Sequence, residues 1–588
     1  MTRFLKHALA WWAAISFAVA VYDVVTGGFH VTIAGIRISS FEAYKPYRNG
    51  IACACAAFWL RDRQADGNTS WDRLIRWSAP LAVCAAALSV LLAISFGIFV
   101  AGGSDAYGFV SQAALWASGR LIVPEQLATI GRALGIITAP LGYRPATVPG
   151  SSVPTYAPGF PMLMALASKV AGDSTVFFVV PVCAGIVVVL TFLIGARLAG
   201  PRTGFLAAVL LTCSPIFLFE SLEPMSDVPV TMWLLVAWWL LLKDRTTATA
   251  AAGLATTAAL LTRPNLAPLA GVMLLVALRG RPRAARGLWF LLGTLPGVVA
   301  IAAINRHLYG TAAMSGYGSL RELFEWNSLV PNLQRYPVWL VQLHTPAILL
   351  ALIAPFLGRR EPDAERAIPS PRGAALWMMA FGVVLLLSYL FYGVFDDWPY
   401  LRFLLPAIPL LLVLSSNVFV AFLLRLPIAF RGATLFAVCV LMGTWYLKKA
   451  DRLGVYAIGI SERRYESVGR YLERALPANA AVLTVIESGS VRLYAGRATL
   501  RWDEVPAGTL DRTLDALRAG GYTPYILLED WEAPMFRARF GPADLAGRVD
   551  WPAAIECYGP ITVRIYDPED RKRYVAGEHW LPKIVPHM

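Results

Sequence analysis

Long apolar stretches separated by short basic segments dominate the first 450 residues. A helix needs about 20 apolar residues to cross a bilayer, within a range of about 17–25. We read thirteen such stretches, several of them short. They cover residues 8–25, 46–60, 78–100, 175–196, 204–221, 228–242, 247–262, 264–278, 287–304, 337–357, 373–392, 402–421 and 433–447. The pattern predicts a mainly α-helical, polytopic membrane protein with about thirteen transmembrane helices.

Basic residues orient these spans, because Lys and Arg collect in cytoplasmic loops. With thirteen spans, every basic cluster from Arg3 and Lys6 to Arg425 and Arg431 falls on one side of the membrane. One missed or extra span would break this alternation. We therefore expect a cytoplasmic N-terminus, and outer segments at 101–174, at 305–336 and from about 451 onward.

The tail from about residue 451 has a different pattern. Helical periodicity covers 463–475 and 510–517, and short strand-like runs cover 481–486, 525–528 and 561–566. This predicts a soluble α/β domain on the outer face. The predicted domains are a transmembrane hairpin with a cytoplasmic loop at 1–77, a transmembrane catalytic domain at 78–450 and the outer domain at 451–588.

Composition supports a membrane protein. Of 588 residues, 57% are hydrophobic and 15% are charged, against about 25% charged in soluble domains. This excludes a soluble enzyme, a disordered chain and a disulfide scaffold. The net charge of +14 follows from the basic cytoplasmic loops, so we expect membrane lipids and no nucleic acid as partners. Abundant Ala and Arg indicate a bacterial source, which makes the inner membrane the expected location and the periplasm the outer side.

The first candidate for chemistry is Asp105, just past the third predicted span. Ser104 is a suitable cap for a helix from Asp105 to about Ser118. Asp105 then lies in the first turn, where the helix dipole favours an ionised carboxylate. The alternative is a helix-start residue on a solvated loop.

Three acids, Glu220, Glu223 and Asp227, occupy the next outer loop, which contains no Lys or Arg. Such acids suit a divalent cation such as Mg²⁺ or Mn²⁺, a cationic substrate or a neighbouring Arg. We take Glu223 and Asp227 as the candidate metal ligands. An ordinary acidic loop is the alternative.

Two further segments carry charge at the outer face. Arg263, in LLTRPNLAP, has the planar fork that binds two phosphate oxygens, unless it pairs with one of the acids. Asp396, Asp397, Trp398 and Arg402 share a short loop before the twelfth span. They form a candidate surface for sugar or phosphate, with an interfacial aromatic belt as the alternative.

Four motifs occur in order on the predicted outer face: SDAYGFVSQA, Y-x-P-G-F-P, EPMSDVPV and RFLLPAIPLLL. Together the set resembles the membrane glycosyltransferases of GT-C fold, in particular protein O-mannosyltransferases and the aminoarabinose transferase of lipid A, in their bacterial branch. The mannosyltransferases carry Asp-Glu in the first motif, whereas Asp105 is followed here by Ala106. A second carboxylate then has to come from Glu223 or Asp227, which leaves metal dependence open.

The resemblance implies an inverting glycosyltransferase that moves a hexose or pentose from a polyprenyl-phosphate donor to an acceptor hydroxyl of a lipid, polysaccharide or protein. Asp105 is then the general base, and Arg263 and Arg402 bind the donor phosphate. The substrate-binding candidates are Tyr107, Tyr156, Asp396, Asp397 and Trp398. The alternatives are a transporter or flippase of lipid-linked glycans, and a ligase or polymerase of pre-assembled chains.

Overall fold

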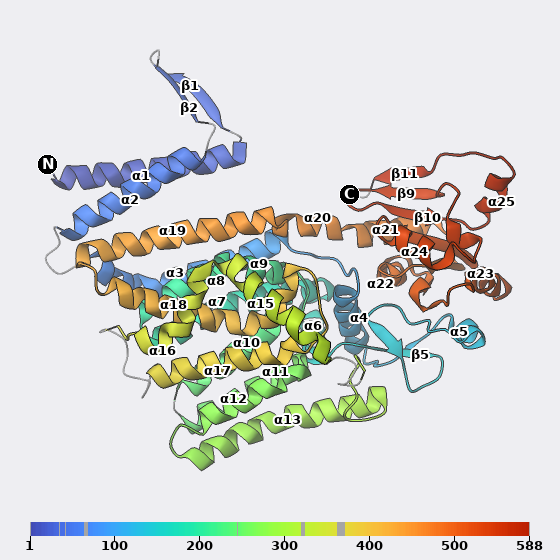
Figure 1. The fold of residues 1–588 in the computed structure, drawn as a ribbon, viewed down its shortest axis with the longest axis horizontal. Helices are drawn as coiled ribbons and strands as arrows, with labels where there is room; N and C mark the ends of the chain where they lie inside the picture. Colours follow the sequence, from blue (N-terminus) through green and yellow to red (C-terminus); the bar gives the residue numbers. More distant parts are fainter. Residues whose placement is uncertain are drawn as a thin grey trace.

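The computed structural model describes residues 2–26, 28–33, 36–40, 43–63, 69–243, 245–318, 324–361 and 371–586. Its helices run along a common direction in a large bundle, and an α/β unit from the end of the chain lies at one end of that bundle (Figure 1). The boundaries of the three predicted domains stay a prediction.

Each of the thirteen predicted spans coincides with helix. The helices of the bundle are α1 (Thr2–Thr26), α2 (Tyr44–Arg63), α3 (Ser70–Phe96), α7 (Val179–Leu198), α8 (Pro201–Cys213), α9 (Pro215–Leu222), α10 (Asp227–Leu241), α11 (Thr246–Thr262), α12 (Ala267–Ala277), α13 (Arg283–Tyr309), α15 (Leu329–His344), α16 (Ala354–Leu357), α17 (Pro371–Leu390), α18 (Ile408–Leu423) and α19 (Ile428–Arg452). Among the described residues, seven helices are long and apolar enough to cross a membrane, or up to nine if each bent pair is one span. The count of thirteen stays a prediction.

Two of the predicted spans are bent. The α8–α9 pair bends by 60° where Ser214 meets Pro215, and α15 bends by 107° away from the segment Pro346–Leu357. Prolines Pro215 and Pro346 stand at the two breaks and donate no backbone hydrogen bond to the preceding turn. The segment predicted as one span over 337–357 is therefore interrupted at Pro346, and whether it crosses the membrane stays a prediction.

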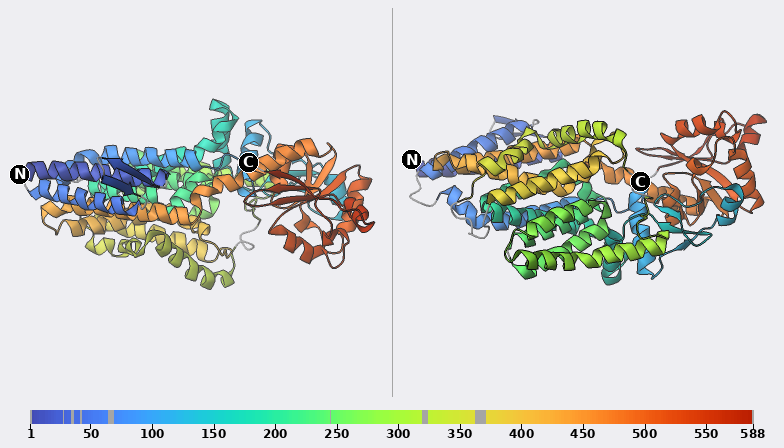
Figure 2. Two further views of the ribbon diagram at one scale, coloured as in Figure 1. Left: turned by 90° about the horizontal axis from the view of Figure 1, so that it is seen from above. Right: turned by 60° about the horizontal axis from the view of Figure 1, so that its bottom comes forward.

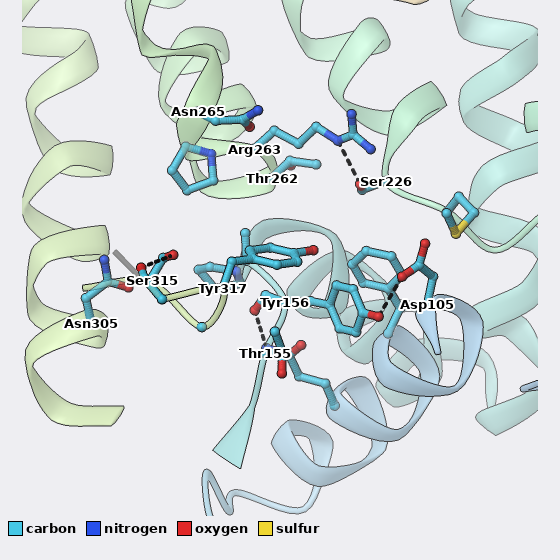
Figure 3. Close-up of a pocket in the computed structure, with 18 of the residues that line it drawn as sticks. Asp105, Thr155, Tyr156, Ser226, Thr262, Arg263, Asn265, Asn305, Ser315 and Tyr317 are labelled. Atoms are coloured by element: carbon cyan, nitrogen blue, oxygen red, sulfur yellow. Dashed lines mark hydrogen bonds between the residues drawn. The ribbon is translucent and has the colours of Figure 1, made fainter. Parts of the chain in front are cut away.

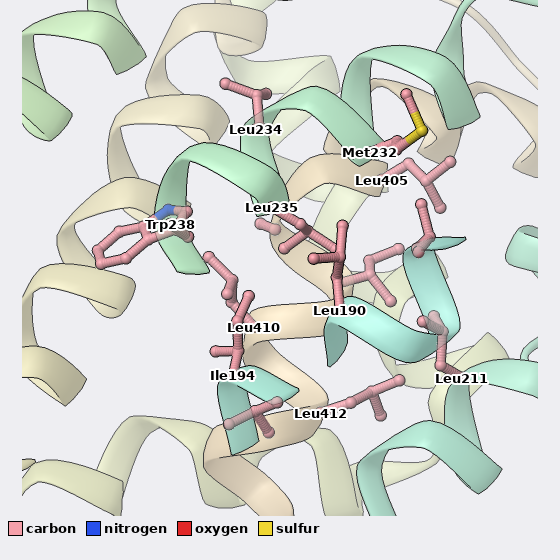
Figure 4. Close-up of a cluster of buried hydrophobic side chains, with 14 of the residues drawn as sticks. Leu190, Ile194, Leu211, Met232, Leu234, Leu235, Trp238, Leu405, Leu410 and Leu412 are labelled. Carbon is pink, nitrogen blue, oxygen red and sulfur yellow. The ribbon is translucent and has the colours of Figure 1, made fainter. Parts of the chain in front are cut away.

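The interior of the bundle consists of aliphatic side chains from helices that are apolar on every side. Leu190 and Ile194 of α7 meet Trp238 of α10 and Leu410 of α18, and these four side chains are buried (Figure 4). A helix that is hydrophobic all round belongs in a core or a membrane. This core fixes α10 and α18. Asp227 is the first residue of α10, and Arg402 lies in the segment just before α18. The α1–α2 pair lies along α19 at the side of the bundle (Figure 2).

The outer segment 101–174 contains three helices and a small sheet. Its elements are α4 (Asp105–Ala117), β3 (Val123–Pro124), α5 (Ala128–Leu134), β4 (Tyr143–Pro145), β5 (Ser151–Pro154) and α6 (Gly159–Ala171), with strand order β3-β5-β4. The helix expected from Asp105 is confirmed as α4. The predicted cap is wrong: Ser104 makes no side-chain cap, and its hydroxyl lies 2.9 Å from the Tyr156 hydroxyl instead.

The chain end folds around a six-stranded mixed sheet with strand order β11-β9-β10-β8-β6-β7. The predicted elements are confirmed as α21 (Arg464–Ala475), β6 (Ala480–Leu483), α23 (Leu510–Ala519), β8 (Thr523–Glu529) and β10 (Val563–Tyr566). The sequence did not predict β7 (Ala498–Leu500), β9 (Ile555–Tyr558), β11 (Lys583–Pro586) or the helices α20 (Ile458–Glu462), α22 (Ser488–Ser490), α24 (Glu532–Phe540) and α25 (Asp570–Val575). We call residues 453–586 the α/β unit.

Candidate active site

Asp105 is held at the start of α4 by two different partners. Gly103 precedes it with a φ of +58°, a conformation that glycine adopts without strain. The Tyr156 hydroxyl donates to Oδ1 at 2.6 Å (Figure 3). The Arg402 guanidinium lies 3.3 Å from Oδ2. An ionised carboxylate has about four acceptor positions, and the Asp105 side chain is 36% exposed. Asp105 therefore has acceptor positions left for a hydroxyl group of a bound molecule.

Tyr156 is the hydrogen-bond donor to Asp105, and its side chain is held in place. Its side chain is buried, with a ring 4.4 Å from that of Phe109 in α4. Burial, and secondly the charge of Asp105, raise the pKa of Tyr156 well above its ordinary value. The phenol therefore stays protonated and keeps its hydrogen bond to Asp105 across the physiological pH range.

Arg402 lies in the 3₁₀ segment η5 (Trp398–Ala407), immediately before α18. Four carboxylates lie within its electrostatic reach: Asp105, Glu220, Glu223 and Asp227. Among the described residues, Arg402 forms an ion pair only with Asp105. The Nε of Arg402 is buried and has no hydrogen-bond partner in the described part of the chain. Arg402 thus has donor capacity left for an anion.

Arg263 follows the C-terminal end of α11 and is more fully bound. One Nη donates to Oδ2 of Asp227 at 2.7 Å, and Nε donates to the Ser226 hydroxyl at 3.1 Å. The alternative in which Arg263 pairs with one of the nearby acids is therefore realised. The guanidinium still faces the space that contains Asp105.

That space is a cavity of about 500 Å³ next to the start of α4, within the range of small-molecule sites. Figure 3 shows Asp105 and Tyr156 on one side of it and Asn305 and Ser315 on the other. Its polar lining includes Asp105, Tyr156, Arg263, Asn265, Tyr317 and Arg402. The cavity brings together four predicted site residues, which are Asp105, Tyr156, Arg263 and Arg402.

Sequence reasoning missed an aromatic wall of this cavity. The wall consists of Tyr389, Tyr392, Phe395, Tyr400 and Phe403. Tyr389 and Phe403 are stacked with ring centroids 4.7 Å apart, and Phe395 and Tyr400 are stacked at 3.8 Å. The aromatic residues around the DDWPYLR motif were the available signal. Tyr317 had no such signal, because it lies in an outer loop without a recognisable motif.

The two candidate metal ligands do not line the cavity. Asp227 is buried against Arg263, and Glu223 lies in the turn between α9 and α10. Among the described residues, no group of three or more His, Cys, Asp or Glu side chains is placed to hold a metal ion. Glu220 is fully buried, and neither of its carboxylate oxygens has a hydrogen-bond partner within the described part of the chain. The predicted divalent cation therefore stays a prediction.

Four other candidates are not among the residues that line the cavity, and their contact with substrate stays a prediction. Asp396 forms an ion pair with Arg335, and Asp397 accepts a hydrogen bond from the Trp398 backbone at 2.7 Å. The Trp398 ring packs against Phe219.

Tyr107 is the fourth, and it is buried on the side of α4 that faces the α/β unit. It is two residues from Asp105, and side chains with this spacing do not share a helix face.

Residues 153–309 match the family model described as dolichyl-phosphate-mannose-protein mannosyltransferase. The crystal structure of ArnT from Cupriavidus metallidurans bound to undecaprenyl phosphate covers 83% of this chain and 98% of its own, with a TM-score of 0.51 and 9% identity. This chain has the GT-C fold. The resemblance to GT-C glycosyltransferases, predicted from four motifs, is thereby confirmed.

A further solved structure also resembles this chain. The oligosaccharyltransferase of Archaeoglobus fulgidus, tethered to an acceptor peptide, gives a TM-score of 0.48 at 11% identity and covers 82% of this chain and 73% of its own. No curated protein matches the chain by sequence. The segment matched by the family model begins in β5 and ends with α13. It thus contains Tyr156 and Arg263 of the cavity.

Proposed function

We propose that this protein is an inverting glycosyltransferase that moves a sugar from a polyprenyl-phosphate donor to an acceptor hydroxyl. The observation that carries the proposal is the cavity, where a partly exposed carboxylate, Asp105, touches an arginine, Arg402, with spare donors. A general base and an anion-binding group are the two functions that this reaction needs. The GT-C fold and the family match support the same class of reaction.

In the proposed step, Asp105 takes the proton of the acceptor hydroxyl while the hydroxyl oxygen attacks the anomeric carbon of the donor. The bond from that carbon to the phosphate oxygen breaks, and its electron pair leaves with the polyprenyl phosphate. Arg402 and Arg263 stabilise the charge that develops on the phosphate. Tyr156 holds the base in place, and one displacement inverts the anomeric centre.

The lipid part of the donor follows from chemistry and fold. A sugar available outside the cytoplasm needs a carrier that has crossed the membrane, and the similar ArnT structure holds undecaprenyl phosphate. In our proposal the cavity opens to the periplasm from the bacterial inner membrane, the N-terminus is cytoplasmic, and the acceptor is a lipid, polysaccharide or protein. Membrane lipids surround the bundle.

The proposal is tested with purified protein in liposomes that contain polyprenyl-phosphate sugars labelled in the sugar, with an envelope extract of glycans and glycolipids added as the source of acceptor. We expect transfer of one sugar unit and release of free polyprenyl phosphate. Movement of the label across the bilayer without cleavage of the donor would instead establish a flippase. Transfer of a pre-assembled chain would establish a ligase or polymerase.

Glu223 gives this activity an expected pH dependence. Burial raises the pKa of its carboxyl to about 8, with the charge of Arg402 acting in the opposite direction. As the pH rises through that value, Glu223 ionises and adds a negative charge near Arg402. The KM for the anionic donor should then rise by about tenfold. Glu223→Gln cannot ionise, so KM measured across this range should stay flat. An unchanged alkaline rise in the variant would assign the effect to another group.

A further inference from the structure

The α/β unit touches the turn that precedes Asp105. Gly102 lies against the ring of Tyr465 in α21, and a Cβ on Gly102 would come within 1.9 Å of that ring. The Gly102 carbonyl accepts a hydrogen bond from the Tyr107 backbone at 3.1 Å, inside the first turn of α4. Tyr465 therefore packs directly on the backbone that starts the helix of the proposed base.

A second contact of the same kind runs in the opposite direction. Tyr107 of α4 packs on Gly489 of α22, and a Cβ on Gly489 would lie 2.2 Å from the Tyr107 ring. The Ala101 amide donates to the Tyr494 hydroxyl at 2.8 Å. The segment 101–107 is thus held by two interlocked tyrosine–glycine contacts and one hydrogen bond, all with partners in the α/β unit.

Tyr465 is itself fixed by a buried ion pair. Arg464 donates to the Tyr465 hydroxyl at 2.7 Å and to the Glu529 carboxylate at 2.8 Å. Glu529 is the last residue of β8, in the interior of the sheet, and is fully buried. The position of the Tyr465 ring therefore depends on the folded sheet.

We propose that Tyr465 is a positioning residue for Asp105, and that the α/β unit fixes the direction of the proposed base through it. The inference rests on the proposed function. Asp105 begins α4 directly after the Gly102–Gly103 turn, so a shift of that turn shifts the carboxylate against Tyr156 and Arg402. A misplacement of about 1 Å at a reacting group costs on the order of 10²-fold in rate.

The first test uses two variants of Tyr465 and one control. Tyr465→Ala removes the ring behind Gly102 and should lower kcat about 100-fold, with the affinity for undecaprenyl phosphate unchanged, because Arg263 and Arg402 belong to the bundle. Tyr465→Phe keeps the ring and should restore most of kcat. The control is Tyr558→Ala, which removes a tyrosine of β9 that is 64% exposed, and it should behave as wild type.

A second measurement does not depend on enzymatic activity. Hydrogen exchange of the Ala101 and Tyr107 amides, which donate to the Tyr494 hydroxyl and the Gly102 carbonyl, should accelerate in Tyr465→Ala and stay as in wild type in Tyr558→Ala, with the sheet still protected. Gly102→Ala forces a Cβ into the Tyr465 ring and disturbs the same contact. Adding Tyr465→Ala to Gly102→Ala should therefore make exchange no faster than in Gly102→Ala alone. Unchanged exchange in Tyr465→Ala would overturn the inference. Faster exchange without any transfer by wild-type protein would leave the positioning contact standing and refute the proposed function.

Discussion

We expect Asp105→Asn to abolish sugar transfer while the protein still folds and reaches the membrane at its normal level. The amide cannot take a proton from the acceptor hydroxyl, and loss of a general base costs about 10²–10⁴-fold in rate. The amide oxygen still accepts the hydrogen bond from Tyr156, so the first turn of α4 keeps its partner. Transfer is measured on reconstituted protein with saturating donor, and folding by thermal unfolding in detergent.

The matched control is Asp173→Asn. Asp173 is an exposed acid of the same outer segment and lies in the first turn of a short 3₁₀ helix. It is not among the described residues that line the cavity, so activity should match that of wild type. Full activity of Asp105→Asn would show that another group removes the acceptor proton.

Arg402→Lys is expected to have the second-largest effect. Lysine keeps one positive charge among the four carboxylates, so the protein should fold, but it loses the planar fork that binds two phosphate oxygens. Removal of one well-placed donor to a developing anion costs about 10²–10³-fold. The kcat and the dissociation constant of undecaprenyl phosphate are measured separately.

Arg263→Lys is the comparison for this result. Arg263 already donates to Asp227 and Ser226, whereas Arg402 retains spare donors. We therefore expect Arg263→Lys to weaken donor binding with a smaller loss of kcat. Equal losses in the two variants, or wild-type donor affinity in Arg402→Lys, would remove Arg402 from the phosphate site.

The hydrophobic pattern predicted the helices of the bundle well, because a membrane helix depends mainly on a local run of apolar residues. The break at Pro346 lies inside such an apolar run. Hydropathy does not indicate in which direction a helix axis runs, so the pattern did not reveal the bend. Strands β7, β9 and β11 have three or four residues each, and their pairing depends on distant parts of the chain. A pattern this short does not identify them.

The sequence identified the charged groups of the site but not their pairing. Asp105 and Arg402 are 297 residues apart, and only the tertiary fold brings their side chains together at the cavity. Tyr107 and Tyr156 both stood in recognised motifs, yet only Tyr156 faces the cavity. Which tyrosine does so depends on how α4 is rotated against the α/β unit, which is a tertiary property.

The most direct test compares envelope glycans and glycolipids of cells that carry wild-type protein with those of cells that carry Asp105→Asn, by mass spectrometry at equal membrane levels of the two proteins. We predict that one sugar unit disappears from one glycan in the variant, and the missing mass names both the sugar and the acceptor. An unchanged profile in the variant, together with a changed profile in cells that lack the gene, would contradict a transferase that uses Asp105 as its base.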